Sequence, residues 1–416
     1  MDGQEIVAWA QALSRHSDST QHYTRTYLTP AHQAAAREIA QSMRDAGMAV
    51  RTDAVGNVIG RYEGASPGAR ALVIGSHFDS VRDGGKYDGV LGILLGIACV
   101  AELARSNERL PVAIEVVAFA DEEGTRFQTG MLSSRSIVSG FDPALLERRD
   151  PQGVTLADAM RAVGLDPARA GEARIDPSKI AAYVEVHIEQ GPVLLNEGKA
   201  LGVVTAIAAG ARHLMTVNGE KGHAGTVPMA LRHDALAAAA EMVLAVERRC
   251  SAGGSLVGTV GILEVKDGTG NVIPGEVRFS VDIRAADRET LEAAQRDVFA
   301  ELDAIAARRG VRLAGNRTHD VRPVPCAPAM QDQIAAAIER TVGGGPARRL
   351  PSGAGHDAMI LAEITDVGMM FVRCGAGGVS HNPAETVSPE DAALAARALL
   401  EVLRTFVPVQ RRRGGE

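Results

Sequence analysis

The chain has 416 residues, of which 46% are hydrophobic and 23% charged, a composition typical of a soluble globular protein with about two to three domains. Its net charge of −7, and the absence of a basic stretch before the last few residues, disfavour nucleic acid and anionic membranes as partners. Aromatic residues make up only 3%, too few for the stacking platforms that bind nucleic-acid bases. An anionic substrate would therefore need a local arginine to hold it against the overall charge.

Cysteine usage and the N-terminal segment predict a cytoplasmic protein. The first residues combine an acidic start with an interrupted apolar pattern, unlike a signal peptide. The longest apolar run, residues 90–101, is too short to span a bilayer. The cysteines fit neither a zinc-knuckle nor a disulfide-framework spacing, so we expect buried, reduced thiols at Cys99, Cys250, Cys326 and Cys374.

The first predicted elements are a helix and a pair of strands. Thr29 and Pro30 are typical of a capped helix start, and they precede a helical pattern over residues 31–46. Residues 50–61 predict two strands joined by a turn.

The segment from Gly75 to Gly92 carries two strong metal ligands, His77 and Asp88, in a glycine-rich loop. The short β-branched run just before it predicts a buried strand (71–75), and the apolar run after it is long enough for a helix (90–103). In an open α/β sheet, such a loop lies in the crevice beyond the carboxyl end of a strand, where ligands bind. On its own, the loop is either a metal site or an elaborate turn.

Further apolar strands are also followed by possible metal ligands. They are residues 112–120 with Glu122 and Glu123, 183–187 with His187, and 368–374 with His381. A single strand-end histidine is usually a surface or capping residue, but the joint occurrence favours a shared site. A catalytic zinc usually takes three protein ligands, whereas five suit two metals about 3.5–4 Å apart with one bridging carboxylate.

The pattern changes near residue 210 and returns to the earlier style near residue 323. Alternating strands and alanine-rich helices between these points predict an α+β sandwich inserted into an α/β domain. The expected strands are 213–217, 257–265 and 276–283, and the expected helices are 235–249 and 288–308. We therefore expect one domain from residues 1–210 plus 323–416, and a second from residues 211–322.

Several motifs resemble one enzyme family over residues from about 53 to about 390. They are GSHFDSV, GGKYDGVLG, DEEGTRF, EVHIEQGPVL, GHAGTVPM and SHNPAE, in this order. This set is similar to the di-metal amidohydrolases of the M20 peptidase clan, in the branch that holds allantoate amidohydrolases, N-carbamoyl-L-amino acid hydrolases and ureidoglycolate amidohydrolases. The resemblance implies a di-metal exopeptidase-like catalytic domain with an inserted, ferredoxin-like lid and dimerisation domain.

The resemblance also implies the roles of the metal-site residues. Two divalent ions, zinc or manganese, would be held by His77 with His187 and by Glu123 with His381, and Asp88 would bridge them. Asp79 would be the carboxylate behind His77 that fixes its ring, as metal-bound histidines regularly require. Glu122 would be the general base; if both adjacent acids coordinated metal, no base would remain.

Substrate contacts are implied at Gln190, Asn271, Arg284 and His223. Asn271 and Arg284 would bind a carboxylate, and His223 would stabilise an oxyanion, reaching the active site of a neighbouring subunit. An ion pair with Asp282 or Asp287 is the alternative for Arg284.

Three further features stay open at this point. Residues 352–356 could present backbone N–H groups to an anion or form an ordinary loop. Arg373 and Cys374 could line the pocket or pack in the core.

The implied function is hydrolysis of a ureido C–N bond by a homodimer that pairs through the inserted domain. The motifs FADEEGTRFQ, PSGAGHDAM and FVRC favour allantoate, giving ureidoglycine, ammonia and carbon dioxide. N-carbamoyl-L-amino acids are the alternative substrates, and simple dipeptides are a weaker one. A metal-binding scaffold without turnover is the non-enzyme alternative, and it would be expected to lose Glu122, His223 and Arg284 before the ligands; all three are present.

Overall fold

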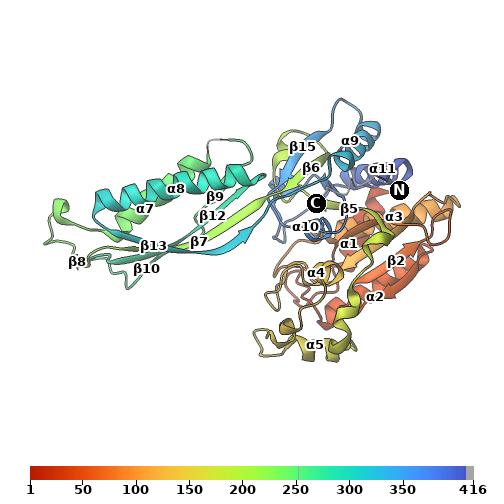
Figure 1. Cartoon of the computed structure of the whole chain (residues 1–416), viewed down its shortest axis with the longest axis horizontal. Helices are drawn as coiled ribbons and strands as arrows, with labels where there is room; N and C mark the ends of the chain where they lie inside the picture. Colours follow the sequence, from red (N-terminus) through yellow and green to blue (C-terminus); the bar gives the residue numbers. More distant parts are fainter. Residues whose placement is uncertain (252, 409–416) are drawn as a thin grey trace, which may run out of the picture. The chain divides into compact units, whose positions relative to one another are not determined.

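The computed structural model describes residues 1–251 and 253–408. The chain divides into two compact units (Figure 1). Of the described residues, the first comprises Met1–Thr205, Cys326–Leu350 and residues 355–408, and the second comprises Ala206–Pro325 and Pro351–Ala354.

The first unit is built on a mixed sheet, which confirms the α/β class predicted from the sequence. Its strands follow the order β1–β2–β4–β3–β5–β16–β6, with β15 also paired to β6; the short strand β14 continues the sheet at Ala206 and Ile207, and these residues and β14 are counted in the second unit. Strands β4, β3, β5 and β16 are parallel to their neighbours in this series, whereas β2 and β6 are antiparallel to theirs. The bounds are β1 Ala49–Thr52, β2 Val58–Tyr62, β3 Ala71–His77, β4 Ala113–Phe119, β5 Ile180–Ile188, β6 Leu201–Ile207, β14 Val324–Pro325, β15 Arg348–Ser352 and β16 Val367–Val372.

The helices of this unit are α1 Gly3–Leu13, α2 Pro30–Asp45, α3 Val90–Arg105, α4 Leu132–Val138, α5 Leu156–Ala162, α6 Val193–Asn196, α9 Pro328–Val342, α10 Ala358–Leu361 and α11 Pro389–Thr405. The predicted cap of α2 is confirmed, because the Thr29 side chain accepts the N–H of His32. Helix α3 is apolar on nearly all sides, and it is buried against β3, β5 and α11. Its position directly after the Asp88 loop anchors that loop to the core.

Because β4, β3, β5 and β16 are parallel, the loops that carry the predicted metal ligands begin at one edge of the sheet. His77 at the end of β3 pairs with Phe119 at the end of β4, and His187 in β5 pairs with Phe371 in β16. Every residue of β3, β5 and β16 is buried, as the apolar runs of β3 and β16 predict; β5 is buried throughout although its sequence alternates with Glu185 and His187. The loops after these four strands therefore begin side by side.

The second unit is an α+β sandwich. Its antiparallel sheet has the order β10–β12–β7–β13, with β9 also paired to β12, and α7 and α8 pack on one face (Figure 1). Alternate residues of β12, among them Phe279 and Val281, are buried in the cluster beneath the helices. The bounds are β7 Ala209–Asn218, β8 Gly222–His223, α7 Ala235–Cys250, β9 Val257–Thr259, β10 Leu263–Val265, β11 Val272–Ile273, β12 Glu276–Ala285, α8 Arg288–Arg309 and β13 Arg312–Val321.

Two details of this unit differ from the sequence prediction. The single strand expected over residues 257–265 is wrong, because the chain leaves the ladder around Gly261 and forms β9 and β10 as separate strands. The edge strand β13 was not predicted, since its residues are mostly exposed and polar and lack an alternating apolar pattern.

All four cysteines are free and buried, as predicted. Among the helices of the described residues, none combines the length and apolar character needed to cross a bilayer.

His32 gives the first unit a testable dependence of stability on pH. Its ring is buried, stacks on Phe78 at 4.3 Å and donates to the carbonyl oxygen of Ala120 at 2.8 Å. Burial lowers the pKa of His32 to about 4 in the folded protein. Between pH 6.5 and pH 4, His32 is therefore protonated in the unfolded chain but neutral in the folded one. The free energy of unfolding should fall by about 1.4 kcal/mol per pH unit in this range from His32 alone.

Urea unfolding of the parent and of His32→Gln at pH 7.5 and pH 5 checks this. We expect the variant to be less stable at pH 7.5 but to lose less stability on acidification. Equal losses in both proteins would contradict the assignment.

Candidate metal centre

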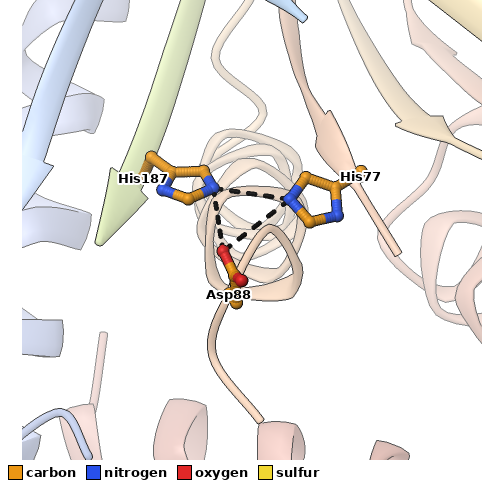
Figure 2. A group of neighbouring side chains, drawn as sticks. All are labelled: His77, Asp88 and His187. Atoms are coloured by element: carbon orange, nitrogen blue, oxygen red, sulfur yellow. Dashed lines mark hydrogen bonds and ion pairs between the residues drawn. The ribbon is translucent and has the colours of Figure 1, made fainter. Parts of the chain in front are cut away.

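Three buried side chains meet beyond the ends of β3 and β5 (Figure 2). His187 Nε2 lies 3.3 Å from Asp88 Oδ1, and His77 Nε2 lies 3.8 Å from the same oxygen. The two Nε2 atoms are 3.5 Å apart, and Figure 2 shows both rings facing the carboxylate. One ligand atom from each residue thus lies within 4.8 Å of the others, a spacing that a single metal ion could span.

A second group of donors shares Asp88. His381 Nε2 lies 3.1 Å from Asp88 Oδ2 and 3.4 Å from Glu123 Oε1. Among the described residues, no group forms a hydrogen bond to the buried Glu123 Oε1, so this oxygen needs a partner. Because Asp88 offers Oδ1 to one group and Oδ2 to the other, the five residues predicted as ligands come together around one shared aspartate.

The histidine rings are oriented for coordination through Nε2. His187 donates its Nδ1–H to the carbonyl oxygen of Ile188 at 2.9 Å, and His77 donates its Nδ1–H to the carbonyl oxygen of Asp79 at 3.1 Å. These bonds leave the Nε2 lone pairs free for a cation, as in metal-bound histidines generally. Imidazole and carboxylate donors suit zinc, manganese and similar divalent ions.

Asp79 connects the two halves of the site. Its carboxylate lies 3.5 Å from His77 Nδ1, but its shorter bonds are to backbone N–H groups, those of Glu122 at 3.0 Å and Glu123 at 3.1 Å. The carboxylate predicted to fix the His77 ring therefore also holds both adjacent acids.

The electrostatics of the site favour cations. Burial raises the pKa of Glu122 well above its usual value and that of Glu123 to about 7. Burial alone would raise the pKa of Asp88 too, but the hydrogen bond from His381 and the nearby histidines hold it below its usual range. The same hydrogen bond to Asp88 raises the pKa of His381 to about 9. Carboxylates crowded in this way are costly without a positive partner, and a divalent ion would supply one.

Gln190, a predicted substrate contact, lies at the centre of the cluster with a left-handed backbone (φ 56°). Its side-chain amide is 3.2 Å from Asp88 Oδ1 and 3.3 Å from His381 Nε2. Positive φ is uncommon outside glycine and tends to be retained at functional sites.

Further residues near the site were either left open by the sequence analysis or had no role in it. His356, from the open segment 352–356, packs edge-on against His187 at 4.5 Å, and both form a third donor group with Glu185. Glu185 was not predicted as a site residue, because it lies within β5 and not at the end of the strand. Arg373 forms a two-point ion pair with Asp391, which favours packing over a role in the pocket.

Three predicted substrate residues belong to the second unit. Strand β8 pairs with β11, and the N–H of Ala224 donates to the carbonyl oxygen of Asn271 at 3.0 Å, so His223 and Asn271 lie close together. Gly225 donates its N–H to Nδ1 of the exposed His223 at 3.0 Å, which leaves Nε2–H as the outward donor.

Arg284 is engaged within its own unit. It binds Asp282 through two bonds of 3.2 and 3.0 Å and donates to the carbonyl oxygen of Gly353 at 2.8 Å. The ion-pair alternative is therefore present in this structure. Arg284 also borders a cavity of about 640 Å³ whose lining includes Leu214, Val257 and Ile262.

Comparison with known proteins agrees with this fold. Residues 72–405 match the model of peptidase family M20/M25/M40, and the chain belongs to this family. It is 42% identical to an N-carbamoyl-L-amino acid amidohydrolase of Geobacillus stearothermophilus, over 90% of this chain and 91% of the relative. It is 39% identical to an allantoate deiminase of Arabidopsis thaliana, over 96% and 82%. A hydantoinase/carbamoylase family amidase from Burkholderia multivorans superposes with a TM-score of 0.91 at 34% identity, covering 98% of this chain and 99% of that one.

Proposed function

We propose that this protein is a hydrolase with two divalent metal ions that cleaves a ureido C–N bond of a small carboxylic acid. The observation that carries the proposal is the shared aspartate, because Asp88 directs one oxygen to each group of donors. His77 and His187 would hold one ion, and Glu123 and His381 the other. When bound, such ions can lower the pKa of a water from about 15.7 towards 7.

The protein's own residues would then move the protons and hold the substrate. Glu122 would accept a proton from the attacking water and pass it to the leaving nitrogen, a role that its raised pKa suits. His223 would direct its Nε2–H at the oxyanion, and Asn271, Arg284 and Gln190 would bind the substrate's polar groups. To bind a carboxylate, Arg284 would have to release or share its bonds with Asp282.

Allantoate is the first candidate substrate, and N-carbamoyl-L-amino acids are the second. The chain is 39% identical to an allantoate deiminase and 42% identical to an N-carbamoyl-L-amino acid amidohydrolase. Because these identities are nearly equal, they support the class of reaction more than either substrate. In both cases hydrolysis would leave a carbamate that decomposes to ammonia and carbon dioxide. We also propose that two copies pair through the second unit, so that His223 of one copy serves the site of the other.

A direct assay tests this function. Protein loaded with zinc or with manganese is given allantoate, several N-carbamoyl-L-amino acids and a dipeptide, and ammonia or free amino acid is measured. We expect ammonia from a ureido acid at a rate well above that of dipeptide cleavage. Faster dipeptide cleavage would make the protein an aminopeptidase, and no turnover in either metal form would favour the inactive scaffold.

A further inference from the structure

Glu385 is a buried carboxylate that joins two loops of the candidate metal centre. Its Oε1 accepts the backbone N–H of Tyr87 at 2.9 Å and that of Asp88 at 3.1 Å. Its Oε2 accepts the hydroxyl of Ser380 at 2.7 Å. The Glu385 side chain thus links the loop of Asp88 to the loop of His381. In its bond with Tyr87, the two residues are 298 positions apart in the sequence.

The surroundings leave both loops little freedom around this side chain. A Cβ added at Gly85 would lie 2.0 Å from the carboxyl group of Glu385, so the loop closes directly onto it. On the other side, His381 has a left-handed backbone (φ 54°), and Glu385 donates its N–H to the carbonyl oxygen of Asn382 in the same turn. The turn therefore carries a ligand at one end and the carboxylate at the other.

We propose that Glu385 is a positioning residue that sets the separation between Asp88 and His381, and so specifically maintains the donor group of Asp88, Glu123 and His381. This inference rests on the proposed function, because it assigns Glu385 to the second of the two metal ions. Asp88, which both groups share, is bonded to Glu385, but the turn of Glu385 also carries His381, which belongs to the second group alone; His77 and His187 reach Asp88 from β3 and β5. Loss of Glu385 should therefore weaken the binding of the second ion more than the binding of the first.

Asp150 provides a matched control in the same unit. Its Oδ1 accepts the N–H groups of Gln152 at 3.0 Å and Val154 at 2.9 Å, and its Oδ2 accepts from Arg126 at 3.0 Å. Like Glu385, it is a buried carboxylate with one oxygen that accepts two backbone N–H groups; its other oxygen is paired with Arg126 in place of a serine hydroxyl, and it has no bond to a predicted ligand. Asp150→Ala should lose comparable stability and leave metal binding unchanged.

The experiment measures manganese and zinc binding to the parent, Glu385→Ala, Glu385→Gln and Asp150→Ala, by titration and by metal analysis after dialysis. In Glu385→Ala we expect the second equivalent to bind about 10–100-fold more weakly and the first to be weakened much less. Glu385→Gln keeps an oxygen that can accept both N–H groups, so it should stay within about threefold of the parent.

Several outcomes would overturn the proposal. They are parental binding of both equivalents by Glu385→Ala, equal weakening of both, or the same selective loss in Asp150→Ala. If Glu385→Ala does not fold, Glu385→Asp, which keeps the charge but shortens the side chain by one methylene, must show the selective loss; parental binding there also overturns it. A parent that never binds two equivalents would instead contradict the proposed function.

Discussion

Replacing Glu122 by glutamine is expected to lower kcat by about 10²–10⁴ while both metal ions stay bound. Glu122 is adjacent to a predicted ligand, and burial raises its pKa well above the usual value, which favours the uptake of a proton by its carboxylate. Glutamine keeps the size of the side chain and the backbone N–H held by Asp79, but it cannot accept the proton. The measurements are ammonia release in steady state and metal content after dialysis.

The neighbouring residue is the control for this experiment. Glu123 approaches His381 within 3.4 Å and has an unsatisfied buried oxygen, so Glu123→Gln should reduce metal content as well as turnover. If Glu122→Gln released ammonia like the parent, Glu122 would not be the base. If it lost metal as Glu123→Gln does, the two acids would have the same role.

His223→Ala is expected to lower kcat by about 10²–10³, the usual effect of removing one oxyanion donor. The N–H of Gly225 occupies Nδ1, so the neutral ring presents a single donor, Nε2–H, to its exposed side. His319→Ala is a suitable control, because His319 is an exposed histidine on β13 of the same unit. We expect the loss in kcat without loss of metal, and an unchanged kcat in the control.

A small effect on kcat would contradict the oxyanion role of His223. A rise in KM alone would also contradict it, because that pattern indicates binding that is equal in the ground and transition states.

The features that could be predicted from the sequence are those carried by contiguous residues. The apolar run of β3, the glycine-rich loop and the helix α3 follow one another directly, so His77 and Asp88 could be assigned to the edge of a sheet. Parallel strands then explain why His187 and His381 come to the same edge. The motifs of the family added the pairing of ligands, which spacing alone leaves open.

The features that could not be predicted depend on contacts between distant segments. Glu385 belongs to a quoted motif, yet its bonds to Tyr87 and Asp88 have no local signal. The same holds for the bonds of Asp79 to the backbone of both adjacent acids. Strand β13 was missed for another reason: as an exposed edge it has no apolar face to give a period.

Anomalous diffraction from crystals grown with manganese or zinc tests the central claim most directly. We expect two peaks about 3.5–4 Å apart, one between His77 and His187 and one between Glu123 and His381, with Asp88 touching both. A single peak, or a peak held instead by Glu185, His187 and His356, would contradict the shared-aspartate site.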